Sequence, residues 1–478
     1  MTPARYGRGR SRLPLGSAAT RSAPVHSSEP RRTARYAVIG GGISGLTAAY
    51  RLRRAAGAGT RITLFDPADR LGGILRTETL AGQVMDIGAE AFVVRRPEVP
   101  ALLAELGLAD RVRTPTGVRP LLYSQARLHP LPAGTVNGLP SSAACMTGLV
   151  DADTLARLSA EPNRPLSWSP GADATVAEFV GDRFGPQVVD RSVDPMISGV
   201  YAGSAASIGI RSAVPAVVAE LDRGAPSLTA AVRAVLPPGA PGPVFGAIDG
   251  GYRVLLDALV AASAATWVPT AVERIEPDGA GWLVVDDEGA AHRADGVVVA
   301  TGATPAAALL HRAAPAAAAA ALRVPVASSV VVGLALPGGT PLPAQSGVLV
   351  GAGEVLHAKA ITLSTRKWGP TGNVKLVRLS FGRFGDTVAA STSDERLLDW
   401  ARADLQTVFG LRVDPAESII ARWIDAMPQY GPGHAQLVSA LRAGLPPGLA
   451  VAGNYLDGVG VPGCLVAAGR AAAALVTG

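Results

Sequence analysis

A glycine-rich stretch between two short apolar runs constrains the fold of this chain more than any other feature. The apolar run at residues 35–39 is followed by Gly40, Gly42 and Gly45 in the spacing G-x-G-x-x-G. Residues 46–54 then repeat apolar side chains at helical spacing, and a second apolar run ends at Asp66. Strand, glycine turn, helix, strand and acid in this order predict a dinucleotide-binding βαβ unit.

Each residue of this motif has a physical reason to be there. Gly40 permits the tight turn, Gly42 lets the backbone approach a diphosphate, and Gly45 lets the helix pack closely on the strand. The free N–H groups and the dipole at the helix start attract the phosphates. Asp66 lies about 20 residues beyond Gly45, where an acid accepts hydrogen bonds from a ribose hydroxyl.

Two later glycine-containing turns favour FAD over NAD. The pair Gly72 and Gly73 follows the acid directly, and FAD enzymes of the amine-oxidase type use such a turn to cover the cofactor; an ordinary loop is the alternative. Near the end, residues 449–453 predict a strand, and a small-residue turn leads into a helix over 463–476. If the first turn holds the diphosphate, this last turn would face the isoalloxazine ring.

The rest of the chain predicts a multidomain α/β (α+β) fold. Residues 141–236 form short amphipathic helical pieces, whereas residues 327–384 alternate like a mixed or antiparallel sheet. We therefore expect a Rossmann-like FAD-binding domain of amine-oxidase type, a mixed-sheet substrate domain and an inserted helical domain. The expected boundaries are 1–34 for a disordered Arg-rich tail; 35–95, 245–310 and 445–478 for the FAD domain; 96–135 and 311–444 for the substrate domain; and 136–244 for the helical insertion.

Composition excludes several classes of function. The chain has 44 Lys and Arg against 38 Asp and Glu, but eight arginines lie within residues 1–35, so the body is close to neutral and predicts no nucleic-acid groove. Two cysteines exclude a disulfide framework, and six scattered histidines predict no metal site. No apolar run is long enough to predict a membrane span. The tail resembles a transit peptide in composition, although a disordered extension explains it more simply.

Taken together, the motifs resemble the FAD-dependent protoporphyrinogen and coproporphyrinogen III oxidases over residues 35–478. The glycine turn and the segment around Asn454 are the most specific. The Arg-rich, Lys-poor composition resembles the actinobacterial branch, which implies coproporphyrinogen III as the substrate. The stretches that match are 40–45, 70–73, 86–92, 128–132, 198–203, 367–368, 427–430 with 433–434, and 453–462.

The resemblance implies an oxygen-dependent, six-electron oxidation of coproporphyrinogen III to coproporphyrin III in haem biosynthesis, with hydrogen peroxide as by-product. It implies non-covalent FAD, no catalytic side chain, and a ferrochelatase that acts on the product. We expect a cytoplasmic location, and peripheral contact with a membrane stays an open alternative. The family's ribose acid is usually Glu, so Asp66 is a conservative departure. The implied flavin contacts are Gly40, Gly41, Gly42, Ile43, Ser44, Gly45, Asp66, Gly73, Gly88, Ala89, Glu90, Val272, Asn454, Val459, Gly460 and Val461.

Two cations are candidate substrate contacts. Lys367 is one of only three lysines in the chain, and we expect it near the flavin or the substrate; a solvated strand end is the alternative. Arg119 precedes a predicted strand that leads to a turn expected at residues 128–132. The family anchors its substrate near this point, and Arg pairs well with propionates. A surface arginine is the alternative for Arg119. For Val272, the alternative to backbone contact with adenine is simple core packing.

Three other functions stay open from the sequence alone. Protoporphyrinogen IX is the alternative substrate within the same family. An amine oxidase or carotenoid desaturase would share the flavin domain, although residues 427–430 argue against both. A flavin-binding carrier without turnover is the alternative from a different class.

Overall fold

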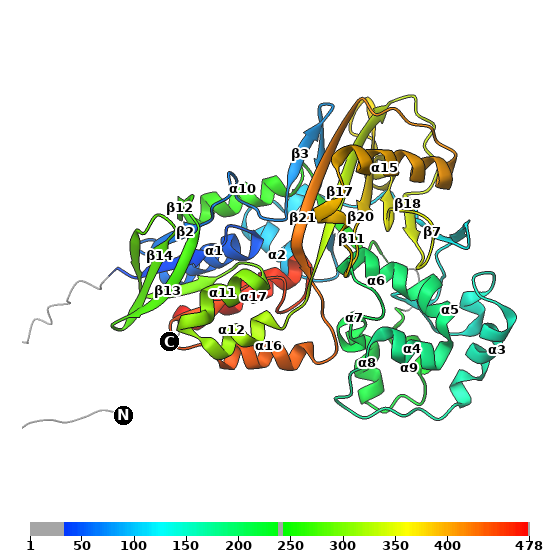
Figure 1. The fold of residues 1–478 in the computed structure, drawn as a ribbon, viewed down its shortest axis with the longest axis horizontal. Helices are drawn as coiled ribbons and strands as arrows, with labels where there is room; N and C mark the ends of the chain where they lie inside the picture. The colour runs from blue at the N-terminus through cyan, green and yellow to red at the C-terminus, as the bar shows by residue number, and fades with distance from the viewer. Residues whose placement is uncertain (1–32, 238–241, 477–478) are drawn as a thin grey trace, which may run out of the picture. The chain divides into compact units, whose positions relative to one another are not determined.

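The structure is a computed structural model that describes residues 33–237 and 242–476. Residues 34–478 form one compact body. The predicted disorder of the tail falls outside the described residues, so it stays a prediction. Figure 1 shows the fold of this body as a ribbon.

A five-stranded parallel sheet begins the fold, and the glycine-rich stretch follows its middle strand. Its order is β12-β2-β1-β16-β22, and every neighbouring pair is parallel. Segments from the start, middle and end of the body therefore meet in one sheet, as the blue, green and red ribbons of Figure 1 show. The strands are β12 (Thr266–Val268), β2 (Arg61–Phe65), β1 (Arg35–Ile39), β16 (Gly296–Val299) and β22 (Leu449–Val451).

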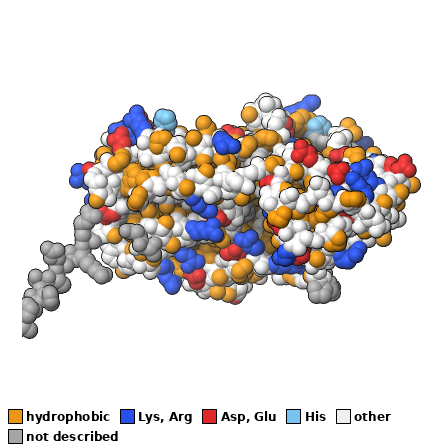
Figure 2. All heavy atoms as spheres, turned by 90° about the horizontal axis from the view of Figure 1, so that it is seen from below, with side chains coloured by type: hydrophobic (Ala, Val, Ile, Leu, Met, Phe, Trp, Pro, Cys, Tyr) orange, Lys and Arg blue, Asp and Glu red, His pale blue; other side chains and the backbone are white. Residues whose placement is uncertain are grey.

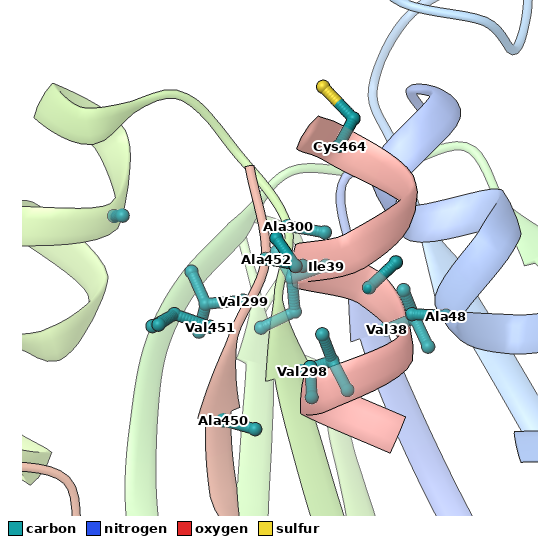
Figure 3. Packing of buried hydrophobic residues seen from close by; sticks show 14 of the residues in the cluster. Val38, Ile39, Ala48, Val298, Val299, Ala300, Ala450, Val451, Ala452 and Cys464 are labelled. Carbon is teal, nitrogen blue, oxygen red and sulfur yellow. The ribbon is translucent and has the colours of Figure 1, made fainter. Parts of the chain in front are cut away.

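Small side chains let three helices pack closely on one another and on this sheet. They are α1 (Ile43–Ala56), α10 (Tyr252–Ser263) and α17 (Val461–Val476). Figure 3 shows Val38 of β1 beside Ala48 of α1, and Val299 of β16 beside Val451 of β22. Four more helices belong to the same core: α2 (Glu98–Glu105), α11 (Ala303–Ala313), α12 (Pro315–Leu322) and α16 (His434–Ala443).

Small antiparallel sheets accompany the parallel one. One of them contacts β1 and β16 through its strands β15 and β14. It consists of β13 (Val272–Asp278), β14 (Gly281–Asp286) and β15 (Ala291–Ala294). The others are the hairpin of β3 (Thr77–Leu80) and β4 (Gln83–Asp86), and the group of β5 (Phe92–Val93), β11 (Phe245–Ile248) and β6 (Val112–Arg113), which follows the turn η1 (Ala109–Arg111).

A seven-stranded mixed sheet forms the second large element. Its order is β21-β17-β20-β19-β18-β7-β8, and only the β7–β18 pair is parallel. Helices α14 (Val388–Ser391) and α15 (Asp394–Phe409) pack on one face, and α13 (Ser364–Trp368) follows β19. The strands are β21 (Glu417–Pro428), β17 (Val326–Pro337), β20 (Val374–Phe381), β19 (Ala360–Thr362), β18 (Gly347–Val350), β7 (Leu121–Ser124) and β8 (Arg127–Pro130).

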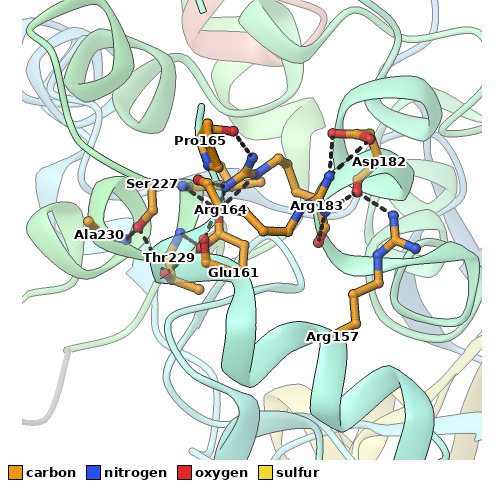
Figure 4. Close-up of polar contacts among 10 residues, drawn as sticks. Arg157, Glu161, Arg164, Pro165, Asp182, Arg183, Ser227, Thr229 and Ala230 are labelled. Carbon is orange, nitrogen blue, oxygen red and sulfur yellow. Dashed lines mark hydrogen bonds and ion pairs between the residues drawn. The ribbon is translucent and has the colours of Figure 1, made fainter. Parts of the chain in front are cut away.

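Residues 135–235 contribute a helical part with an apolar core of its own. A buried ion pair between Glu161 and Arg183 joins three of its segments (Figure 4). The elements are β9 (Thr135–Val136), β10 (Leu139–Pro140), η2 (Ala143–Met146), α3 (Ala152–Ala160), η3 (Glu161–Asn163), α4 (Val176–Phe184), α5 (Pro186–Val188), the π-helical turn η4 (Val189–Val193), α6 (Asp194–Tyr201), α7 (Ile210–Ala213), α8 (Pro215–Asp222) and α9 (Leu228–Val235).

The predicted βαβ unit, mixed sheet and helical part are all present, and one local expectation was wrong. Residues 128–132 were expected to form a turn, but most of them lie in β8, because the chain reverses earlier at Gln125 and Ala126, both with positive φ. The domain boundaries stay a prediction. The helices α2, α11, α12 and α16 pack in the core of the parallel sheet.

The surface shows no large area of one charge on the face drawn in Figure 2, where basic and acidic side chains are interspersed. A hollow on this face lies between the part with α12 and α16 and the part with α8 and α9. Among the described residues, the longest apolar helices fall short of what a membrane crossing requires.

Candidate active site

The first glycine turn leaves one side of its backbone open. Gly40 has a φ of +108°, and a Cβ on Gly45 would lie 1.8 Å from the Gly40 carbonyl oxygen, so both positions require glycine. A Cβ on Gly42 would meet only the Gly73 Cα, at 3.9 Å. Helix α1 has no acidic residue in its first turn and no side-chain cap. Its free N–H groups therefore face a space that suits a diphosphate.

Asp66 and the second glycine pair lie directly against this turn. The Asp66 Oδ2 accepts a hydrogen bond from the Gly41 N–H at 2.5 Å, and its Oδ1 accepts one from Ala68 at 2.9 Å. Each oxygen keeps a further lone pair for a hydroxyl. The Gly72 N–H donates to the Gly41 carbonyl at 2.8 Å, so the Gly72–Gly73 turn packs on the first turn.

The segment from Asp86 to Glu90 is held closely against the chain that follows the second glycine pair. A Cβ on Gly88 would lie 1.7 Å from the Ile74 carbonyl oxygen. Asp86 accepts hydrogen bonds from the Thr77 hydroxyl at 2.5 Å and from the Tyr252 N–H at 3.1 Å. Burial raises the pKa of Asp86 to about 6, against the effect of both hydrogen bonds.

Glu90 and Lys367 form an ion pair beside this segment. The Lys367 Nζ lies 2.5 Å from the Glu90 Oε2, and the Ser364 hydroxyl donates to Oε1 at 3.0 Å. Burial alone would raise the pKa of Glu90, but the charges of Lys367 and Arg378 outweigh it and lower the pKa to about 2. The Lys367 ammonium also lies 4.8 Å from the Trp368 ring centroid. Lys367 therefore lies beside two of the predicted flavin contacts, Ala89 and Glu90.

The turn before α17 is fixed by polar contacts from β21 and α16. The Tyr430 hydroxyl donates to the Asn454 carbonyl at 2.7 Å and accepts from the Gly458 N–H at 3.0 Å. His434 stacks on Tyr430 at 3.7 Å, and burial lowers the pKa of His434 to about 4, so its ring is neutral at pH 7. Val459 and Gly460 follow, half-buried and exposed respectively, while Val461 is buried.

Cys464 lies on the first turn of α17 and is chemically unreactive here. Its side chain is buried, and burial raises the pKa of the thiol to about 11, although the Ser44 hydroxyl opposes the shift. A neutral thiol is a poor nucleophile. This state favours the predicted non-covalent binding of the cofactor.

The two remaining predicted residues lie apart from these segments. Val272 begins β13, is half-buried and pairs with Asp286. Arg119 precedes β7, its side chain is exposed, and its carbonyl accepts from the Ser346 N–H at 3.3 Å. Within residues 33–237 and 242–476, no hydrogen bond or ion pair joins the Arg119 side chain to another residue.

Comparison with known proteins gives this geometry a family. The family profile described as flavin containing amine oxidoreductase matches residues 43–476. This chain belongs to the flavin-containing amine oxidoreductase family. Its cofactor is accordingly FAD, and its fold is the amine-oxidase type expected from the sequence.

Relatives within the flavin-containing amine oxidoreductase family are closely similar over most of the chain. A protein of Mycobacterium tuberculosis (strain ATCC 25618 / H37Rv) named coproporphyrinogen III oxidase is 62% identical over 92% of this chain and 97% of its own length. The Mycobacterium leprae protein of the same name is 60% identical over 92% of this chain and 98% of its own.

Solved structures of the family share the fold. A crystal structure from Exiguobacterium sp. 255-15, provisionally named protoporphyrinogen oxidase, has a TM-score of 0.83 at 25% identity and covers 93% of this chain and 99% of its own. Cyclohexylamine oxidase from Brevibacterium oxydans IH-35A has a TM-score of 0.68 at 16% identity, over 93% of this chain and 99% of its own.

The described residues fit FAD. A Cβ would fill the space above Gly42, the α1 N–H groups are uncapped, and Asp66 retains lone pairs for a ribose. Sequence reasoning missed the roles of Ser364, Tyr430 and Arg378, although Tyr430 lies in a stretch that matched the family. Arg378 donates from Nη2 to the Gly88 carbonyl at 2.5 Å. The only sequence signal for Arg378 was its place on a strand of alternating apolar and polar residues.

Proposed function

We propose that this chain oxidises coproporphyrinogen III to coproporphyrin III, with bound FAD and molecular oxygen. The single observation that supports this best is the identity of 60–62% to mycobacterial proteins named coproporphyrinogen III oxidase, over nearly the whole of both chains. The reaction removes six electrons and six hydrogens from the macrocycle, which three molecules of oxygen accept as peroxide.

The proposal places FAD along the three backbone turns described above. When bound, FAD supplies the redox chemistry, taking hydride from the substrate and passing electrons to oxygen. The chain's part is to hold and orient: the α1 start takes the diphosphate, and Asp66 takes the ribose. The proposed contacts are Gly40, Gly41, Gly42, Ile43, Ser44, Gly45, Asp66, Gly73, Gly88, Ala89, Glu90, Val272, Asn454, Val459, Gly460 and Val461.

No side chain is assigned as an acid or base. The charges of Lys367 and Arg378 keep Glu90 ionised. His434 stays neutral and fixes the turn before α17 rather than exchanging protons. Lys367 and Arg119 remain proposed substrate-side cations. Lys367 is proposed because it lies beside Glu90, and Arg119 because its exposed guanidinium pairs with no described residue.

Product analysis with coproporphyrinogen III and protoporphyrinogen IX side by side tests the function. We expect coproporphyrin III to form with peroxide, at a kcat/KM at least tenfold above that for protoporphyrinogen IX. A preference for protoporphyrinogen IX would replace the proposed substrate by the other family substrate. Bound FAD that dithionite reduces but neither porphyrinogen does would overturn the enzyme function.

Gly45→Val tests the FAD placement. A valine side chain at Gly45 would collide with the Gly40 carbonyl, so FAD binding should be lost. Gly59→Val is the matched control, since an added Cβ at exposed Gly59 meets no atom within 4 Å. Full flavin occupancy in Gly45→Val would disprove the placement.

Two finer expectations belong to the same proposal. We expect the product to pass to a metal-inserting enzyme, a ferrochelatase. We also expect the protein in the cytoplasm, where peripheral contact with the membrane is a further expectation. Sedimentation with anionic vesicles tests the contact. Recovery of the enzyme entirely in the supernatant would argue against it.

A further inference from the structure

One face of the seven-stranded sheet has a row of half-buried residues that we name the open strip. It consists of Leu349 on β18, Ala360 and Thr362 on β19, and Arg378 and Ser380 on β20. The residues between them, such as Ile361 and Leu379, point to the other face and are fully buried under α15. Towards β17 the same face is covered, because Leu376 and Val331 pack on Met85 of β4. The open strip is therefore the part of this face that is less completely buried.

Other elements cover the ends of this strip. Helix α6 reaches Leu349, since a Cβ on Gly199 would lie 3.6 Å from the Leu349 Cδ2. At the other end Arg378 contacts the Gly88 carbonyl, in the segment proposed to hold the flavin. The open strip therefore starts at the helical part and ends at the proposed cofactor site.

The polar groups on the open strip lack partners. Arg378 makes one side-chain hydrogen bond to the described residues, from Nη2 to Gly88, and no carboxylate oxygen among them lies within 4.0 Å of its nitrogens. A guanidinium has five N–H donors, so most of them remain unused. The hydroxyls of Thr362 and Ser380 likewise bond no described residue.

The charge near Arg378 also favours an anionic ligand. Lys367 pairs with Glu90 at 2.5 Å, whereas Glu90 and Asp86 act on Arg378 over a longer distance, so no carboxylate of the described residues pairs directly with Arg378. A partly desolvated cation with free donors binds a carboxylate strongly and in a fixed orientation, because the planar fork matches two oxygens.

We propose that Arg378 binds a propionate carboxylate of the porphyrinogen, with the open strip as the surface under the macrocycle. This inference rests on the proposed function, which supplies the carboxylate-bearing substrate. It makes Arg378 a determinant of substrate affinity at the flavin end of the strip, distinct from the exposed Arg119.

Binding of the product coproporphyrin III to the FAD-loaded enzyme tests the proposal by quenching of porphyrin fluorescence. Arg378→Met should weaken binding by about ten- to a hundredfold, the range expected for loss of a charge-assisted hydrogen bond. Arg378→Lys keeps the positive charge but loses the planar guanidinium. Its affinity for coproporphyrin III should lie between those of the wild type and Arg378→Met. Lys375→Met removes a charge from the same strand, where Lys375 has no partner among the described residues, and should bind like the wild type.

The tetramethyl ester of coproporphyrin III provides a test on the wild type alone. It lacks carboxylates, so it should bind at least tenfold more weakly than the acid, and Arg378→Met should not weaken it further. Equal wild-type affinity for ester and acid would overturn the proposal even if the variants fail to fold. Unchanged acid binding in Arg378→Met, with altered FAD content or flavin absorption, would also overturn it and assign Arg378 to the cofactor. Failure of the wild type to oxidise coproporphyrinogen III is a separate result that concerns the proposed function.

Discussion

Two buried clusters of a carboxylate and a cation differ in how many of their hydrogen-bond donors and acceptors have partners. In the helical part, Glu161 accepts from the Arg183 guanidinium, from the N–H groups of Leu228 and Thr229 and from the Thr229 hydroxyl (Figure 4). Arg183 donates its other hydrogens to carbonyls of Pro165 and Arg164. The two side chains are 0% and 3% exposed, so this cluster is closed.

The Glu90 cluster uses the same chemistry but is left open. Glu90 and Lys367 are 13% and 22% exposed, and the neighbouring Arg378 keeps unused donors. A closed cluster can only join segments of the chain, whereas an open one can accept a ligand. We therefore expect unused hydrogen-bonding capacity to mark a ligand site better than the presence of buried charge does.

Glu161→Gln should have the largest effect, and on stability alone. The change leaves Arg183 buried without its carboxylate, which costs about 3–5 kcal/mol of unfolding free energy. Urea unfolding measures this loss, and kcat/KM per folded enzyme should stay unchanged. Glu220→Gln is the control, because the Glu220–Arg223 pair is on the surface and should cost below about 1 kcal/mol. An equal loss in both variants would contradict the comparison.

Lys367→Met should instead affect function. It removes the cation that lies 2.5 Å from Glu90, so the segment proposed to contact the flavin loses a neighbouring positive charge. We expect kcat/KM for coproporphyrinogen III to fall about tenfold, equal to about 1.4 kcal/mol. Lys375→Met should change it less than twofold. Equal, small effects in the two variants would remove Lys367 from the site.

The pH dependence of stability should separate the clusters. Asp86, near Glu90, has its pKa raised to about 6 by burial, so the folded chain binds a proton there more tightly than the unfolded chain. The unfolding free energy should therefore fall by on the order of 1 kcal/mol between pH 5 and pH 7, and Asp86→Asn should remove this slope. The pKa of Glu161 is lowered despite burial, by hydrogen bonds from Thr229 and Arg183, so its stabilisation is lost only below about pH 4.3.

Identical slopes in the wild type and Asp86→Asn, measured by urea unfolding at each pH, would show that Asp86 does not titrate in this range. Glu161→Gln should retain the wild-type dependence of unfolding free energy on pH between pH 5 and pH 7. The reason is that the Glu161 carboxylate of the wild type stays ionised in this range.

Arg119→Ala should have the smallest effect on the fold. Arg119 is exposed and belongs to neither cluster, so the unfolding free energy should change by less than about 0.5 kcal/mol. As a proposed substrate contact, it should still lower kcat/KM for coproporphyrinogen III. Wild-type kcat/KM on both porphyrinogens would remove Arg119 from the site.

Local patterns explain why the glycine turns and the parallel sheet could be predicted. The spacing of Gly40, Gly42 and Gly45 is fixed by contacts within about 30 residues, between β1, α1 and β2. Apolar runs and helical periodicity likewise located β16, β22 and α17. These signals depend on short segments that the sequence displays directly.

The open cluster depends on tertiary pairing and could not be predicted in this way. Glu90 and Lys367 are 277 residues apart, and Arg378 reaches Gly88 across 290 residues. Their meeting requires β20 to lie between β17 and β19 in a particular register, which an alternating pattern does not determine. Before the strands are paired, Arg378 looks like any polar residue on an amphipathic strand. Arg183 was equally hidden, since charged residues on an amphipathic helix suggest a solvated face.

The position of β22 and α17 in the first sheet has a consequence for how the protein is made. The strand next to β16 and a helix that packs on α1 come from residues 449–476, so the flavin-binding core cannot close until these residues leave the ribosome. The face of α1 that packs on α17 stays uncovered during most of synthesis, and β16 lacks its neighbour β22 from residue 299 to residue 449. The helical part has its own core and can fold earlier. Chaperone demand should therefore fall on the nascent parallel sheet, and a stop codon that removes only β22 and α17 should yield aggregated chains.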